Sequence, residues 1–239
     1  MVFDSSLYFI TDSTGFDREE FLERVESALQ GGVTLLQLRE KNRTTREYIE
    51  LAEAVHQLTR KYNVPLIIDD RVDVMLAVDA EGVHVGAEDM PVSIARKLAG
   101  PDKIVGATAK TVEAAKAAYE AGADYLGVGA IYPTTTKVKT VLTSTDTLRA
   151  ITEAVPIPVN AIGGLNADNL GVLEGINIAG ICAVSAIMKA DNPCEAAKAL
   201  YKAFPKSKAF PLRAETMLQH CLPPRRGGRG TALAVDEVS

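Results

Sequence analysis

The sequence predicts a single closed (β/α)8 barrel, because eight short apolar runs alternate with segments of helical period. The alternation extends from residue 7 to about residue 204. Strands that alternate with helices pair in parallel through right-handed crossovers. Eight units in about 200 residues favour closure into a barrel with short loops. The alternative is an open doubly wound sheet, which the lack of a GxGxxG motif after the first strand disfavours.

The predicted strands are short and rich in β-branched and other apolar residues, as is typical of strands in a buried parallel sheet. Glycine, proline or polar residues follow most of them and mark the turns into the next helix. In chain order they are LYFIT (7–11), TLLQLR (34–39), PLIID (65–69), GVHVG (82–86), KIVGAT (103–108), YLGVGAI (125–131), PVNAIGG (158–164) and GICAVSAIM (180–188).

The segments between the strands carry signals for helix starts and ends. Thr44 followed by Glu47 forms a capping box at the start of TREYIELAEAVHQLTRKY. The last helix is expected to start at Asn192, with Pro193 as its first residue. Glycines are frequent just past helix ends because they adopt left-handed backbone conformations. They stand where helices should end at positions 31, 32, 100 and 122.

Composition restricts the class of protein. A chain of 239 residues with 47% hydrophobic content can bury one substantial core. Its net charge of -5 gives no general electrostatic reason to bind nucleic acid or an anionic membrane. It has no run of eighteen uncharged apolar residues and no N-terminal pattern of a signal peptide. The odd number of cysteines, Cys182, Cys194 and Cys221, fits a reducing cytoplasm better than a disulfide framework.

Residues 205–239 differ from the barrel, which we assign to residues 1–204. This C-terminal segment has no sustained period and contains a Pro/Gly/Arg run, which predicts a flexible tail. The alternative is an arm that packs on a neighbouring subunit through Met217, Leu218 and Leu222. The sequence does not determine the oligomeric state, and a homo-oligomer is compatible with it.

Three polar side chains at the end of the second strand predict an anion site. Gln37, Arg39 and Lys41 occupy alternate positions, which places them on one face of an extended chain. A guanidinium and an ammonium bind oxyanions in complementary ways, as a fork and as a point charge. We therefore expect a cradle for a phosphate-rich ligand. The alternative is a solvated strand end whose cations pair with Glu40 and acids such as Glu19.

Three acids follow the third and fourth strands. Asp69, Asp70 and Asp89 are expected at the tops of adjacent strands, because active sites of barrels form at the carboxyl ends of the strands. Mg2+ commonly takes one or two carboxylates and completes its shell with waters and substrate phosphates. The alternative is a simple helix N-cap, above all for Asp89, which stands just before Met90 and Pro91. Together with the nearby cations, the acids predict a diphosphate site with Mg2+.

Hydroxyl groups and a lysine follow the sixth strand, where Pro133 fixes the turn. Thr134, Thr135 and Thr136 offer hydrogen bonds, and Lys137 adds a charge that can lie against a transferring or departing phosphate. The fifth strand likewise ends at a hydroxyl, that of Thr108.

A second anion site is predicted after the seventh and eighth strands, where barrels of this kind usually hold a phosphate. Gly163 and Gly164 would let backbone N–H groups approach a ligand, and Ser185 stands near the next turn. The alternative for the glycines is tight packing of strand against helix. Two anion sites would suit two phosphorylated small-molecule substrates.

The three histidines do not indicate catalysis by a nucleophile and base. His56, His84 and His220 are far apart in sequence and have neither metal-site nor triad spacing. His84, inside the fourth strand, is expected to be a hydrogen-bonded residue of the core or rim.

Taken in order, these motifs closely resemble the thiamine phosphate synthase family. The resemblance covers about residues 7–190 and rests on LYFITD, QLREK, DDRVDVMLAVDAEGVHVGAEDMP, GADYLGVGAIYPTTTK, AIGG and VSAI together. It implies a (β/α)8 barrel and one Mg2+ per subunit. It also implies a reaction that joins a hydroxymethylpyrimidine diphosphate to a thiazole phosphate and releases diphosphate.

The resemblance assigns roles by motif. Arg39, Lys41 and Lys137 would stabilise the departing diphosphate, and Asp70 and Asp89 would bind the metal. The pyrimidine diphosphate would be held by Gln37, Leu38, Arg39, Glu40, Lys41, Asp69, Thr108 and Lys137. The thiazole phosphate would be held by Thr134, Thr135, Thr136, Gly164, Val184 and Ser185.

This sequence departs from the family at two of these positions. Asp69 stands where asparagine is common, and Thr108 stands where serine is common. A carboxylate beside a diphosphate repels it unless a cation or metal neutralises the charge, so Asp69 is expected to be a further metal ligand or a group behind one. Two other functions are possible for such a barrel: a thiazole tautomerase, which would not need the cationic cradle, and a phosphate sensor without catalysis.

Overall fold

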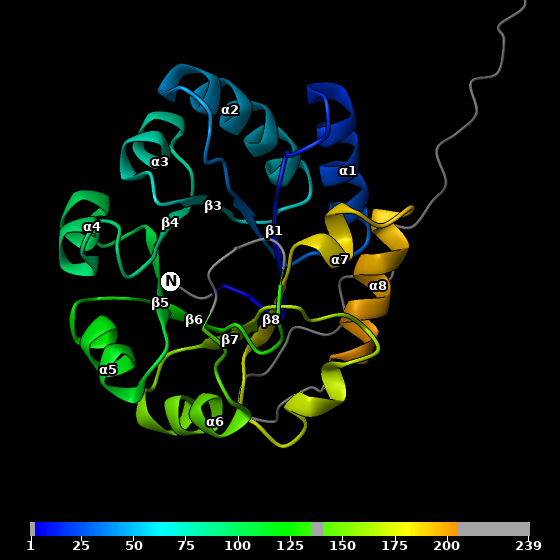
Figure 1. Cartoon of the computed structure of the whole chain (residues 1–239). Coiled ribbons are helices and arrows are strands. Elements are labelled where there is room, and N and C mark those ends of the chain that lie inside the picture. Colours follow the sequence, from blue (N-terminus) through cyan, green and yellow to red (C-terminus); the bar gives the residue numbers. More distant parts are fainter. Residues whose placement is uncertain (1–2, 135–140, 205–239) are drawn as a thin grey trace, which may run out of the picture.

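The computed structural model describes residues 3–134 and 141–204. Eight parallel strands close into a barrel in the order β1 to β8, and β8 pairs back to β1. Helices surround the strands on the outside (Figure 1). The predicted (β/α)8 barrel is therefore confirmed. The expected tail, residues 205–239, lies outside the described residues.

The strands are four to six residues long, as expected for the short runs that predicted them. They are β1 (Leu7–Ile10), β2 (Leu35–Leu38), β3 (Leu66–Asp69), β4 (Gly82–Val85), β5 (Ile104–Ala109), β6 (Tyr125–Gly129), β7 (Val159–Ile162) and β8 (Gly180–Ala183).

The outer layer consists of α-helices and one 3-10 helix, η1. The α-helices are α1 (Arg18–Gln30), α2 (Thr45–Lys61), α3 (Val72–Val78), α4 (Val92–Ala99), α5 (Val112–Glu120), α6 (Thr145–Ala154), α7 (Ser185–Met188) and α8 (Pro193–Ala203), and η1 spans Leu170–Leu173.

Two expected elements were wrong. The eighth strand does not extend to residue 188, because β8 ends at Ala183 and the following residues form α7. The crossover from β7 to β8 contains η1 in place of an α-helix. There the side chains of Asn166 and Asn169 accept hydrogen bonds from nearby backbone N–H groups. Such local bonds compete with the helical hydrogen bonds.

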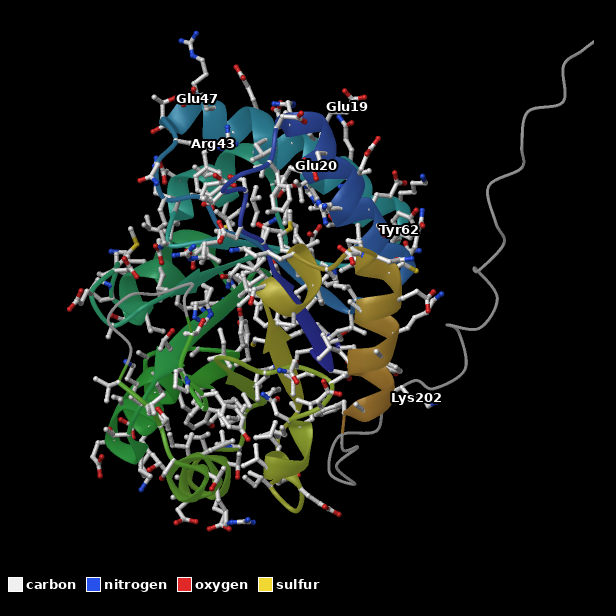
Figure 2. All side chains as sticks on the ribbon, turned by 45° about the vertical axis from the view of Figure 1, so that its right-hand side comes forward. Glu19, Glu20, Arg43, Glu47, Tyr62 and Lys202 are labelled. Atoms are coloured by element: carbon white, nitrogen blue, oxygen red, sulfur yellow. The ribbon has the colours of Figure 1, made fainter. Side chains whose placement is uncertain are left out.

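The helix caps follow the sequence. Thr44 and Glu47 form both halves of a capping box at the start of α2, and the side chain of Asn192 caps α8. Figure 2 shows Glu19, Glu20 and Glu47 toward one end of the molecule and Lys202 toward the other. Acids at helix starts and a base in the last turn of α8 match the helix dipole.

Alternation along the strands divides the core into two layers. One set of side chains faces outward and packs under the helices. The other set faces the barrel axis and forms a separate cluster of Tyr8, Ile10, Leu35, Ile67, Ile104, Tyr125 and Cys182. The register aligns these inward positions across neighbouring strands, for example Tyr8 with Leu35 and with Cys182. Inward residues near the carboxyl ends of the strands therefore converge at one end of the barrel.

Space inside the barrel depends on glycine at one position in particular. A Cβ atom on Gly106 would overlap the ring and hydroxyl of Tyr125, which lies in the adjacent strand. Tyr125 is fully buried and cannot move into solvent.

We predict that Gly106→Ala destabilises the barrel. The added methyl group overpacks the interior, which typically costs about 1–3 kcal/mol. The free energy of unfolding, measured by urea denaturation, should fall by that amount. Gly171→Ala is the matched control, since nothing lies within 4 Å of the corresponding Cβ position, and it should change the same quantity by less than about 1 kcal/mol. Equal stabilities of the two variants would contradict the prediction.

Candidate functional site

A cluster of cations and acids lies at the carboxyl ends of β2 and β3. The ammonium of Lys41 is 2.8 Å from Asp69 Oδ2 and donates a hydrogen bond to Asp70. Arg39 Nε lies 3.7 Å from the same oxygen atom of Asp69. The backbone N–H of Arg39 is held by the side chain of Thr11, from the loop after β1. The structure thus brings together four of the residues predicted to form the diphosphate site.

Asp69 faces the barrel interior and is only 7% exposed. Burial raises the pKa of its carboxyl group, against the opposing effects of Lys41 and Arg39. Burial likewise opposes the charge of Lys41, but its two aspartate partners hold its pKa above the usual value. Asp69 Oδ2 accepts no hydrogen bond of regular geometry within the described part of the chain. The contact between Lys41 and Asp69 is therefore an ion pair.

Asp70 and Asp89 approach each other from the loops after β3 and β4. Asp70 has a left-handed backbone, with φ of 59°, and its N–H donates to the carbonyl of His84 at 2.8 Å. Asp89 accepts a hydrogen bond from the N–H of Gly86 at 3.0 Å, where a Cβ atom would lie only 2.6 Å from the carboxylate. Burial, followed by the hydrogen bond with Asp70, raises the pKa of Asp89. Pro91 occupies the N-cap of α4, so the alternative of Asp89 as a simple cap is wrong.

These acids fit a magnesium ion that is completed by its substrate. Among residues 3–134 and 141–204, no group of three or more His, Cys, Asp or Glu side chains is arranged to hold a metal. A pair of carboxylates on adjacent loops is nevertheless what Mg2+ uses when phosphates and waters supply its other ligands. The donor set is therefore suitable for a metal–diphosphate complex and unsuitable for a closed structural site.

Two further residues of the QLREK motif turn away from this cluster. Leu38 is fully buried in the outer layer, and its carbonyl accepts a hydrogen bond from Tyr48. The side chain of Glu40 is 5% exposed and accepts hydrogen bonds from Ser13 and Arg43. Its Oε1 accepts no hydrogen bond from the described residues. The described partners of Glu40 are Ser13 and Arg43. These contacts do not support the alternative in which Glu40 neutralises the cations of the cradle.

Among the residues predicted to hold the second phosphate, those that the structure describes lie at the ends of β6, β7 and β8. A Cβ atom on Gly164 would lie 2.8 Å from the carbonyl oxygen of Pro133, the residue before Thr134. The two loops are therefore in close contact, and packing explains at least part of the need for glycine. Val184 precedes Ser185, the first residue of α7. The predicted residues Thr135, Thr136 and Lys137 lie outside the described residues.

The sequence analysis missed a polar group inside the barrel. The hydroxyl groups of Tyr8 and Tyr125 are hydrogen-bonded to each other inside the barrel. Gln37 is hydrogen-bonded to Tyr8, His84 to Tyr125, and Thr108 to His84. The expectation that His84 is a hydrogen-bonded core residue is confirmed. A signal was present in the sequence, because all five are polar residues at inward-facing strand positions.

Known proteins resemble this chain over most of its length. The family described as thiamine monophosphate synthase matches residues 7–187. The chain belongs to the thiamine monophosphate synthase family. The thiamine-phosphate synthase 2 of Streptococcus pneumoniae is 53% identical over 186 residues, which are 78% of this chain and 89% of the relative. The thiamine-phosphate synthase of Methanobrevibacter smithii is 48% identical over 201 residues, covering 84% and 96% of the two chains.

Solved structures agree with this family assignment. The thiamine phosphate pyrophosphorylase from Pyrococcus furiosus superposes with a TM-score of 0.77 at 43% identity, over 83% of this chain and 95% of that one. A 3-hexulose-6-phosphate synthase, with a TM-score of 0.67 at 18% identity, shares the fold. The chain is accordingly an enzyme, a transferase of thiamine biosynthesis. Within the described residues, no helix is long and apolar enough to cross a membrane.

The buried His84 gives the family barrel a testable dependence of stability on pH. Burial lowers the pKa of His84 from 6.5 to about 4. Between these values the unfolded chain binds a proton at this residue that the folded barrel does not bind. The contribution of this residue to the free energy of unfolding is therefore fully present above pH 6.5 and is lost as the pH falls toward 4. The loss amounts to up to about 3 kcal/mol.

We predict that His84→Gln removes this part of the pH dependence. The free energy of unfolding should be measured by urea denaturation through the same pH window for the wild type and the variant. Their difference isolates His84 from the acids that also titrate there. The His56→Gln variant, which removes another buried imidazole, is the comparison. A slope that is equally steep in the wild type and in His84→Gln would contradict the assignment.

Proposed function

We propose that this enzyme couples 4-amino-2-methyl-5-hydroxymethylpyrimidine diphosphate with 4-methyl-5-(2-phosphoethyl)thiazole, or its carboxylated form, to give thiamine phosphate and diphosphate. The observation that carries the proposal is the cluster of Arg39 and Lys41 with Asp69 and Asp70. It lies where a barrel of this kind places its active site. A diphosphate leaving group needs cations and a metal at such a place, whereas isomerisation of a thiazole ring does not.

Arg39, Lys41 and Lys137 would stabilise the leaving group. The bond from the pyrimidine methylene carbon to the diphosphate oxygen breaks, and its electron pair leaves with the diphosphate. The ring delocalises the positive charge of the remaining methylene cation. The lone pair of the thiazole nitrogen then forms the new carbon–nitrogen bond. No strong base on the protein is required, and each charge-assisted contact to the departing oxygens could lower the barrier by about 3 kcal/mol.

Asp70 and Asp89 would hold Mg2+, whose role when bound is to neutralise charge on the diphosphate. Their mutual approach supports this assignment, since two carboxylates in contact repel each other unless a proton or cation lies between them. In the described structure, Lys41 supplies such a charge to Asp70. With Mg2+ bound, Lys41 would be directed toward the diphosphate instead of Asp70 while keeping its contact with Asp69.

Asp69 would remain behind the cations rather than contact the diphosphate. It already neutralises Lys41 and Arg39 at 2.8 and 3.7 Å. In this position its carboxylate orients both cations and is separated from the anion by them. Gln37 and Thr108 would face the pyrimidine diphosphate from the inner surface of the barrel, together with the backbone near Leu38 and Glu40.

The thiazole phosphate would occupy the opposite side of the barrel mouth. Thr134, Gly164, Val184 and Ser185 come from three neighbouring strand ends, which supports a shared phosphate pocket. The proposal also assigns Thr135 and Thr136 to this pocket.

The first test is an assay with both phosphorylated substrates, with and without Mg2+, that measures diphosphate release and detects thiamine phosphate by mass. Both products should appear only when all three components are present. Turnover of the thiazole phosphate alone would indicate the tautomerase. Binding of a substrate without any turnover would indicate a phosphate sensor.

We predict that Lys41→Met lowers kcat/KM for the pyrimidine diphosphate by about 100-fold. The cause is the loss of a positive charge against the leaving group. The KM for the thiazole phosphate should stay within about twofold, because only the diphosphate side loses a contact. Lys61→Met serves as the control, because it removes a surface lysine paired with Glu26 and should leave both constants unchanged. Equal loss in the two variants would remove Lys41 from the mechanism.

We predict that Asp70→Asn raises the Mg2+ concentration for half-maximal activity by at least about tenfold, since a neutral amide is a weaker ligand for a hard cation. Steady-state rates over a Mg2+ titration measure the effect. Asp73→Asn is the control, because Asp73 pairs with Arg71 at the start of α3 and should not alter the titration. An unchanged titration in a folded Asp70→Asn enzyme would exclude Asp70 as a ligand.

A further inference from the structure

Five side chains form a continuous chain of hydrogen bonds across the inside of the barrel. Gln37 Nε2 donates to the Tyr8 hydroxyl at 2.7 Å, and the hydroxyl oxygens of Tyr8 and Tyr125 are 2.6 Å apart. His84 Nδ1 lies 3.1 Å from the Tyr125 hydroxyl, and His84 Nε2 lies 3.0 Å from Thr108 Oγ1. The chain begins and ends at two residues that we assign to the pyrimidine diphosphate.

For a given orientation of the Gln37 amide, the donors and acceptors of these five side chains allow only one direction of hydrogen-bond donation. Tyr8 accepts from Gln37, so its only hydrogen is donated to Tyr125. Tyr125 in turn donates to His84 Nδ1. His84 must then carry its proton on Nε2 and donate to Thr108, whose own hydroxyl hydrogen remains available to a ligand.

The buried environment of these hydrogen-bonded side chains favours a fixed order of donors and acceptors. Tyr8, Gln37 and Tyr125 are 2% exposed or less, and His84 is 8% exposed. Burial raises the pKa of both tyrosines well above the usual value. Both hydroxyl groups are therefore neutral at pH 7, as the ordered chain requires. Leaving one of these buried groups unpaired would cost about 1–3 kcal/mol, so the bonds are expected to break or reverse together.

We propose that Tyr8, Tyr125 and His84 are positioning residues that couple the two ends of the chain, so that Gln37 presents an acceptor to the substrate only when Thr108 presents a donor. With Gln37 Nε2 toward Tyr8, its Oε1 is directed to accept an N–H group of the ligand. If the amide turned over, every link would reverse, and Thr108 would donate to His84 instead of to the ligand. This inference rests on the proposed function for the identity of the ligand.

The complementary pair would favour one class of pyrimidine. Oε1 of Gln37 accepts from an exocyclic amino group, whereas a ring carbonyl at that position would need a donor. Turning the amide to supply that donor would withdraw the hydroxyl hydrogen of Thr108 from the ligand. An aminopyrimidine is thus favoured over a pyrimidine with a carbonyl group at the same position.

The decisive measurement is the tautomer of His84, observed by 15N NMR of the free enzyme and assigned with His84→Gln. The wild type should show a single tautomer with the proton on Nε2. Gln37→Glu, at alkaline pH, replaces the donor at one end with a carboxylate that can only accept. This change should reverse the chain and move the His84 proton to Nδ1. An unchanged tautomer in folded Gln37→Glu would overturn the proposal.

The Tyr125→Phe variant tests whether the signal passes through the chain. Adding Tyr125→Phe to Gln37→Glu removes the connecting hydroxyl, so the effect of the carboxylate on His84 should disappear. Tyr48→Phe is the matched control, because Tyr48 is equally buried but donates to the carbonyl of Leu38. The effect of Gln37→Glu should persist in that background. Persistence of the effect in the Tyr125→Phe background would also overturn the proposal.

Kinetics separate failure of this proposal from failure of the proposed function. Tyr125→Phe should raise KM for the pyrimidine diphosphate by about tenfold and leave KM for the thiazole phosphate unchanged. A wild-type enzyme that does not couple the substrates would refute the function, while the tautomer measurement would still decide whether the chain is ordered. Normal KM values in Tyr125→Phe would overturn the positioning role.

Discussion

The closed parallel register of the eight strands is the constraint on which the other features of this enzyme depend. Because β8 pairs with β1, the barrel has no free edge, and each inward-facing side chain has neighbours on both sides. Polar residues at the carboxyl ends of different strands are thereby gathered around one axis. Asp69 and His84, for example, are paired in register, and so are Thr108 and Gly127. One polar residue at the end of a short strand cannot form a binding site alone. The closed register brings such residues from several strands together into one site.

Bringing polar groups into a core requires both partners and space. Glycine at position 106 leaves room for the large ring of Tyr125, since a Cβ there would overlap that ring. At the opposite end of the barrel, Asn160 bonds to the side chain and carbonyl of Ser5, so the interior there is also satisfied. These bonds give the barrel a unique internal arrangement as well as stability, because a half-satisfied polar core would be less stable than an apolar one.

Charge at the mouth of the barrel is balanced within the site. Lys41 lies between two aspartates, and Arg39 is near one of them, so the described cations are already neutralised before any ligand binds. A diphosphate accompanied by a metal would exchange these internal partners for external ones. The net gain would be smaller than for free cations, but the site would discriminate in favour of a metal-bound anion. Asp69, which pairs with both cations, would strengthen that preference.

The sequence by itself determined the number and order of the strands, the cap of α2 at Thr44, and the cations and acids that cluster at the ends of β2 and β3. Those features can be predicted from the local spacing of residues and from their positions relative to the strand ends. Only the tertiary structure decided that Glu40 turns toward Ser13, that residues 185–188 form α7, and that five polar side chains join across the axis. Tyr8 and Tyr125 are 117 residues apart. Their contact depends on the closure and register of the whole barrel, which no local pattern specifies.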